Sequence, residues 1–124
     1  MAQLVSKIID EAPAAPAAAI DRGQLARMTF GDRSLEREVL QLFDRQAGLL
    51  LARMHTGESA AVATLAHTLK GSAASIGATG VVLAAAAVEQ AAGADECDLA
   101  IGRLAMAIDE ACAAIAGLLG ASKG

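Results

Sequence analysis

Residues 67–75 read HTLKGSAAS and interrupt a chain built mostly of alanine and aliphatic residues. In this stretch His67 and Lys70 stand about one helical turn apart, and Gly71 follows at once. A glycine inside a helix costs about 1 kcal/mol relative to alanine. The stretch lies within a predicted helix over residues 59–76. The histidine, the lysine and the glycine therefore require a reason other than helix stability.

The composition predicts an all-α fold. Hydrophobic residues make up 55% of the chain and aromatic residues only 2%, so the strand-forming aromatics are nearly absent. No period-2 alternation of any length appears, and no strand is expected. Apolar residues at helical spacing indicate four substantial helices joined by short loops, which favours an antiparallel up-down four-helix bundle. A length of 124 residues is enough for one such domain.

The first two long helices have recognisable ends. The first is expected to start at a cap, Asp32 or Ser34, and to run to about residue 55. The second, over residues 59–76, is expected to end at Gly77 in the left-handed conformation. Apolar positions of the first helix recur at helical spacing, which predicts that they face the core: Leu35, Val39, Leu42, Leu49 and Leu50.

The last two long helices follow short breaks. Thr79 is expected to cap the third helix, which Gly93 stops, and Asp95 is expected to cap the fourth. Apolar positions of the fourth helix are spaced by three and four and are expected to face the core: Ile101, Leu104, Ile108, Cys112, Ile115 and Leu119.

The N-terminal residues 1–18 are expected to form an appendage or linker, because Pro13 and Pro16 interrupt any helix. A short amphipathic segment precedes the prolines, with apolar residues on one side: Leu4, Val5, Ile8 and Ile9. A short helix is expected over residues 21–28. The domain itself is predicted to span residues 19–124.

Charge and composition exclude several classes of function. The formal net charge is −4, with no Trp or Tyr and no cluster of Lys and Arg, so nucleic-acid binding is not expected. No apolar stretch reaches the roughly 18 residues of a membrane span, and no signal peptide is recognised. Cys97 and Cys112 are expected to be small buried residues rather than a disulfide. We expect a soluble, monomeric, cytoplasmic protein.

The helical wheel predicts that His67 faces out of the bundle. At about 100° per residue, the large apolar residues of its helix lie within roughly 40° of the opposite side. Those residues are Val62, Leu65, Leu69 and Ile76. Small residues surround the histidine within about 60°: Ala60, Ala63, Thr64, Gly71, Ala74 and Ala78. A solvated face normally carries charged residues, so this bare surface is predicted to receive a partner.

Lys70 and Gly71 both lie close to His67 on the predicted helix, although a single lysine on a helix is by itself most simply a solvated surface residue. Lys70 lies at i+3, where its charge disfavours an imidazolium at His67 and can offset the charge of a phosphoryl group. Gly71 lies at i+4 on the outward side. In a chain so rich in alanine, a glycine there indicates that even a methyl group would obstruct what approaches His67.

The stretch HTLKGSAASIGATGVVLAAAAVEQA resembles the histidine phosphotransfer (HPt) domains of multistep phosphorelays. The match covers the His-x-Leu-Lys-Gly-Ser motif, the following Gly77, and Val88 with Glu89 in the next helix. Residues 19–54 also look like the first half of such a domain, so the resemblance spans about residues 19–120. The resemblance implies a four-helix bundle that carries phosphoryl groups between receiver domains.

The resemblance also implies roles for individual residues. His67 would accept a phosphoryl group through Nε2 from an aspartyl phosphate and pass it to an aspartate of another receiver, with Lys70 near the phosphoryl oxygens and clearance at Gly71. Glu89, or its neighbour Gln90, would accept the Nδ1 proton. The receiver domains of a hybrid histidine kinase and of response regulators would be the partners, and they would supply Mg²⁺. The chain itself would need no cofactor, metal or kinase activity.

Two other interpretations stay open at the level of sequence. A dimeric kinase-like phosphotransferase also presents a histidine on a helical bundle, although Thr68 and Gly71 stand where such kinases have an acidic residue and a proline. A helical interaction module without catalytic function is the other. A metal site from His55 and His67 is disfavoured, because the two lie on different elements without cysteine nearby.

Overall fold

The computed structural model describes residues 19–123 and is all-α. The described residues form five helices and no strand. The expectations for residues 1–18, including the amphipathic segment, lie outside the described residues. The helices are a short α3 (Arg22–Met28) and four long ones, α4 (Arg33–Thr56), α5 (Ser59–Ser75), α6 (Thr79–Ala91) and α7 (Cys97–Lys123).

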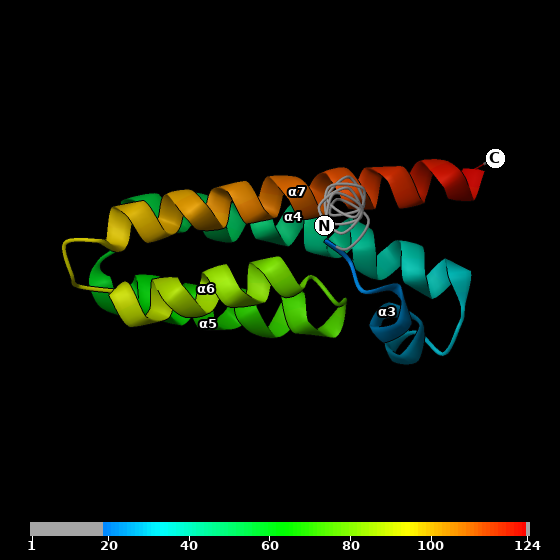
Figure 1. Ribbon diagram of the computed structural model, residues 1–124, viewed down its shortest axis with the longest axis horizontal. Helices are drawn as coiled ribbons and strands as arrows, with labels where there is room; N and C mark the ends of the chain where they lie inside the picture. The colour runs from blue at the N-terminus through cyan, green and yellow to red at the C-terminus, as the bar shows by residue number, and fades with distance from the viewer. Residues whose placement is uncertain (1–18, 124) are drawn as a thin grey trace, which may run out of the picture.

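The four long helices lie side by side along the long axis of the molecule (Figure 1). The colour gradient shows that the chain reverses direction from each long helix to the next. α4 packs against α5 and α7, and α6 packs against the same two helices. The short α3 lies at one end of the molecule and contacts α5. None of the described helices is long and apolar enough to cross a membrane.

Aliphatic and alanine side chains from all four long helices make up most of the core, which also holds Phe43. The predicted stripe of α7 is largely confirmed, since Ile101, Leu104, Ile108 and Ile115 are buried and Cys112 and Leu119 pack at its edge. Alanines without exposed surface lie between the larger side chains and let the helices approach closely: Ala47, Ala66, Ala73 and Ala85. Because the helices lie close together, a chain with few large aromatic residues can still fill the core of the domain.

The predicted core face of α4 was partly wrong. Leu42 and Leu49 are 53% and 63% exposed, whereas Leu50 is buried as expected. The helix turns a different stripe inward: Leu40, Phe43, Ala47, Leu50 and Met54. Two apolar stripes overlap on this helix, and the one that holds the large Phe43 and Met54 buries more surface, which decides the rotation.

The helix ends confirm Asp32 as a cap and correct two others. The Asp32 carboxylate accepts hydrogen bonds from the backbone N–H groups of Ser34 and Leu35. Thr79 does not cap α6 but is its first residue, since the turn at Gly77 leaves Ala78 at the cap position. Asp95 lies two residues before α7 begins, one residue too early for a cap.

Both cysteines are free, as expected, but they are only partly buried. Burial raises the pKa of the Cys112 thiol to about 12, and the neighbouring Asp44 carboxylate acts in the same direction. The thiol therefore stays protonated at neutral pH and behaves as a small core residue.

Gly77 joins α3 to the turn between α5 and α6. Its φ is 76°, in the left-handed region, as predicted. Its carbonyl oxygen accepts a hydrogen bond of 2.8 Å from the backbone N–H of Asp21, the residue that caps α3. The backbones approach so closely that a Cβ at residue 77 would lie 2.6 Å from the Asp21 carbonyl oxygen. Only glycine satisfies both conditions without a shift of α3.

We predict that Gly77→Ala lowers the free energy of unfolding by about 2 kcal/mol or more, because the left-handed φ and the contact with Asp21 both penalise a side chain. Urea denaturation measures the change. Gly102→Ala in α7 is the matched control, since no heavy atom lies within 4 Å of a Cβ there. The control should gain roughly 0.5–1 kcal/mol. An equal response of the two variants would contradict the account of Gly77.

Candidate functional site

His67 stands on the outer side of α5, as the wheel predicted. Its side chain is 71% exposed, whereas Val62, Leu69 and Ile76 on the opposite side are buried. Because three apolar anchors fix the rotation of the helix, the imidazole cannot turn inward without exposing them.

The surroundings of the histidine are small side chains. Ala60, Thr64, Gly71 and Ala74 are exposed on the same side of α5 and, with His67, define what we call the His67 face. A Cβ added at Gly71 would meet no heavy atom within 4 Å, so the glycine is not required for helix packing. Ala78 was wrongly placed on this face. It is buried, because α5 ends at Ser75 and the chain turns inward.

Glu89 contacts the Nδ1 nitrogen of the His67 imidazole. Its Oε2 lies 3.1 Å from Nδ1 of His67, across the contact between α5 and α6. Of the two side chains that the sequence left open, Glu89 makes this contact, whereas Gln90 is exposed on the next position of α6. A carboxylate accepts hydrogen bonds, so this contact favours the tautomer in which Nδ1 carries the proton. Nε2 then presents a lone pair to solvent.

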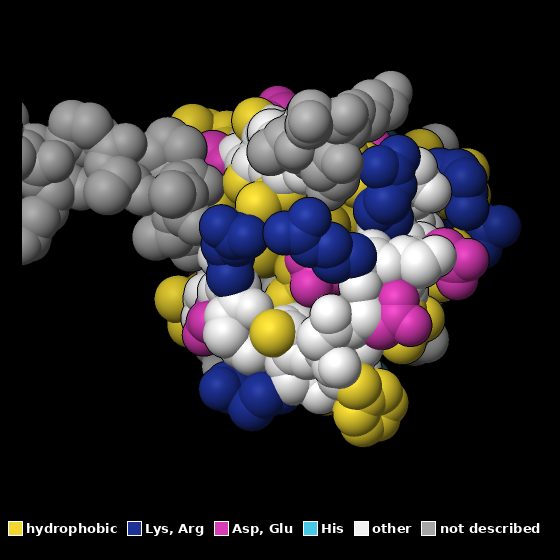
Figure 2. All heavy atoms as spheres, turned by 90° about the vertical axis from the view of Figure 1, so that its right-hand side faces the viewer, with side chains coloured by type: hydrophobic (Ala, Val, Ile, Leu, Met, Phe, Trp, Pro, Cys, Tyr) yellow, Lys and Arg dark blue, Asp and Glu magenta, His cyan; other side chains and the backbone are white. Residues whose placement is uncertain are grey.

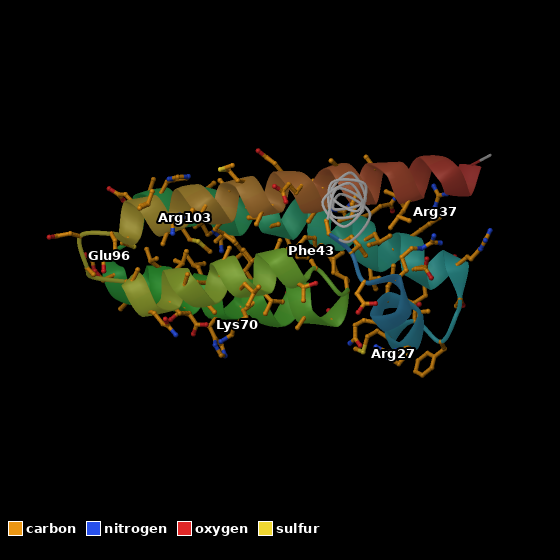
Figure 3. The ribbon with its side chains drawn as sticks, in the orientation of Figure 1. Arg27, Arg37, Phe43, Lys70, Glu96 and Arg103 are labelled. Carbon is orange, nitrogen blue, oxygen red and sulfur yellow. The ribbon has the colours of Figure 1, made fainter. Side chains whose placement is uncertain are left out.

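Lys70 pairs with the same carboxylate. Its Nζ lies 2.7 Å from Oε1 of Glu89, an oxygen that is itself shielded from solvent. The ammonium of Lys70 is the largest cause that lowers the pKa of Glu89, and the hydrogen bond from His67 acts in the same direction. Glu89 is therefore ionised at neutral pH. Figure 3 shows Lys70 projecting from α5 on the side away from α7.

The pairing of Lys70 with Glu89 was not foreseen from the sequence. Spacing within α5 placed Lys70 beside His67, but the partner of the lysine depends on how α6 is registered against α5. Val88 and Ala85 are buried, and this burial turns Glu89 toward α5. The three residues thus form a chain of contacts, His67 to Glu89 to Lys70, which we call the carboxylate bridge.

Ser72, the motif residue after the glycine, faces away from His67. Its hydroxyl donates a hydrogen bond of 3.2 Å to the side-chain oxygen of Gln46 on α4. The sequence predicted that this serine would bond a backbone carbonyl or a neighbouring helix, and the second alternative is confirmed. The contact ties α5 to α4 on the side opposite the carboxylate bridge.

Comparisons with known proteins agree with one family. The family model of the Hpt domain matches residues 34–117, more than half of the chain. A solved structure of a rice protein, assigned as a histidine-containing phosphotransfer protein, is similar with a TM-score of 0.75 and 20% sequence identity. The alignment covers 96% of this chain and 93% of the rice chain, and at this identity it shows the fold alone. None of the curated proteins matches the chain.

The carboxylate bridge predicts a pH-dependent contribution of Glu89 to stability. The pKa of Glu89 is lowered from 4.5, so its contribution is present above that pH and is lost as the pH falls through the lowered value. We expect the melting temperature of wild type to exceed that of Glu89→Gln at pH 7, and the difference to shrink in acid. Thermal denaturation over a pH series measures it.

A Lys70→Met background provides the control for this prediction. Lys70 is the largest cause of the lowered pKa of Glu89. In the Lys70→Met background, the difference in melting temperature caused by Glu89→Gln should therefore depend much less on pH. A difference between wild type and Glu89→Gln that is the same in acid as at pH 7 would rule out the bridge as a stabilising contact.

Proposed function

The chain belongs to the Hpt domain family of histidine phosphotransfer domains, and on this premise we propose that His67 is the phosphoryl-accepting residue of a phosphorelay intermediate. The proposal is carried by one observation. Glu89 engages Nδ1 of His67, and the other ring nitrogen is left on an open surface of small residues. This arrangement suits a nucleophile that must enter the active site of another protein.

In the proposed reaction, the Nε2 lone pair attacks the phosphorus of an aspartyl phosphate on a receiver domain. The N–P bond forms as the bond from phosphorus to the aspartyl oxygen breaks, and the aspartate leaves as a carboxylate. The ring keeps its Nδ1 proton and gains positive charge. The adjacent Glu89 carboxylate stabilises that charge, and its hydrogen bond becomes charge-assisted. Transfer to a second receiver reverses these steps.

Lys70 would assist from the edge of the site. In the unphosphorylated state its ammonium is engaged by Glu89 at 2.7 Å. We propose that the phosphoryl oxygens compete for this ammonium once they are attached to Nε2. Phosphoryl transfer depends mainly on positioning and charge stabilisation, and we propose that the receiver supplies the Mg²⁺ for most of the latter. The chain would need no cofactor of its own.

The proposed partners are the receiver domains of a hybrid histidine kinase and of response regulators, which would dock on the His67 face. We propose that the chain acts as a cytoplasmic monomer without kinase activity, and that its long helices form the antiparallel up-down four-helix bundle expected for the domain. A non-catalytic interaction module and a dimeric kinase-like phosphotransferase are the alternatives. The contact between Glu89 and His67 favours phosphotransfer over the first of them, because binding alone does not require a fixed tautomer.

We predict that His67 is the only residue phosphorylated by a phosphorylated receiver and Mg²⁺. The label should be labile to acid and stable to alkali, as a phosphoramidate is. His67→Gln should abolish it. His55→Gln, which alters the exposed histidine at the end of α4, should leave it unchanged. Phosphate retained by His67→Gln would refute the assignment, and labelling by ATP without an added kinase would favour the kinase-like alternative.

We predict that substitutions at Gly71 separate stability from transfer. Gly71→Ala should raise the free energy of unfolding by roughly 0.5–1 kcal/mol, because the added methyl group meets open space. Gly71→Gln should also fold, yet slow the transfer from a receiver severely by hindering its approach. Denaturation and rapid-quench transfer assays measure the two effects. Gly71→Gln that folds and transfers at the wild-type rate would show that the receiver docks elsewhere.

A further inference from the structure

Three arginine side chains line one cavity at the end of the molecule where α4 begins and α7 ends. Arg22 is the first residue of α3, and Arg33 and Arg37 lie in the first two turns of α4. The cavity has a volume of about 120 Å³ and is completed by Glu36, Leu40, Leu118 and Leu119. We call these seven residues the arginine pocket. Figure 2 views this end and shows Lys and Arg side chains gathered on it.

The residues that line the arginine pocket carry a net positive charge. Three guanidinium groups and one carboxylate leave a local charge of +2, in a chain whose net charge is −4. Among the described residues, the close contacts between acidic and basic side chains belong to the carboxylate bridge, and no side-chain hydrogen bond among these residues involves Arg22, Arg33 or Arg37. Guanidinium groups gathered in this way bind carboxylates and phosphates well.

We propose that the chain's own Asp10 and Glu11 occupy the arginine pocket. The described residues begin at Ala19, three residues before Arg22, whose side chain lines the pocket. Between Glu11 and Ala19 lies APAAPAA, an uncharged linker with two prolines. At about 3.1 Å per residue such a linker spans on the order of 20 Å, which is enough to cross one end of a small domain.

The apolar parts of the segment and the pocket also match. Ile8 and Ile9 directly precede the acidic pair, and the pocket places Leu40, Leu118 and Leu119 beside its arginines. A tethered segment acts at an effective concentration in the millimolar range, so it competes well against a free anion of the same charge. Free phosphate is the other possible occupant, and the experiment below distinguishes the two.

The arginine pocket is separate from the His67 face. In Figure 3, Arg37 lies beside the C-terminal half of α7, whereas Lys70 projects from the far side of α5. Docking of the acidic pair would therefore fasten α3, α4 and α7 together without covering the histidine. The inference is independent of the proposed function, because it concerns the stability of the domain and not phosphotransfer.

A double-mutant cycle on the full chain tests the proposal. The four proteins are wild type, Asp10→Asn/Glu11→Gln, Arg33→Gln/Arg37→Gln and the variant that combines all four changes. We expect the acidic change to lower the melting temperature by about 3 °C with the arginines present and to have almost no effect without them. At about 1 M NaCl, where the Debye length is about 3 Å, this coupling should largely disappear.

Asp95→Asn/Glu96→Gln is the matched control. This acidic pair lies in the turn before α7, at the opposite end of the molecule from Arg37 (Figure 3). Its effect should add to that of the arginine changes without coupling. In NMR spectra, the side-chain Nε–Hε signals of Arg33 and Arg37 should shift on Asp10→Asn/Glu11→Gln and not on the control change.

Additive effects in the main cycle, or arginine signals that do not respond to the acidic change, would overturn the proposal. Inorganic phosphate at constant ionic strength gives a second criterion. We expect it to raise the melting temperature of Asp10→Asn/Glu11→Gln more than that of wild type, because the pocket is empty only in the variant. An equal rise in both proteins would show that the pocket takes a free anion and that the segment does not occupy it.

Discussion

The carboxylate of Glu89 contacts two residues of the neighbouring helix at once, Nδ1 of His67 through Oε2 and Nζ of Lys70 through Oε1. These contacts are possible only if α5 and α6 keep one register. The register follows from alanines that let the helices approach closely, and from the Gly77 turn that joins them. The small side chains that make this core narrow therefore also determine the geometry at the candidate site.

The direction of His67 could be predicted because it depends on one helix alone. The apolar residues Val62, Leu69 and Ile76 define the buried side of α5, and the opposite side follows from helical geometry. The left-handed Gly77 and the Asp32 cap were predictable for the same reason, since a backbone break or a cap is a local event. The all-α class followed from the composition of the chain and from the helical spacing of its apolar residues.

Features that depend on two helices were harder to predict. The rotation of α4 was misjudged at Leu42 and Leu49, because two apolar stripes compete and the choice depends on the space that α5 and α7 leave for Phe43. The sequence also could not decide between Glu89 and Gln90, which lie about 100° apart on α6. Burial of Val88 resolves that choice in the structure, since it turns Glu89 toward α5.

The hydrogen bond between Asp21 and Gly77 joins two backbone groups and uses no side chain. The bond therefore restricts the choice of residue differently at positions 21 and 77. At position 21 any residue that caps a helix can donate the same N–H, so this position is free to vary among the good capping residues. At position 77 the left-handed φ and the nearby carbonyl admit only glycine. We therefore expect residue 21 to vary among related sequences and residue 77 to remain glycine.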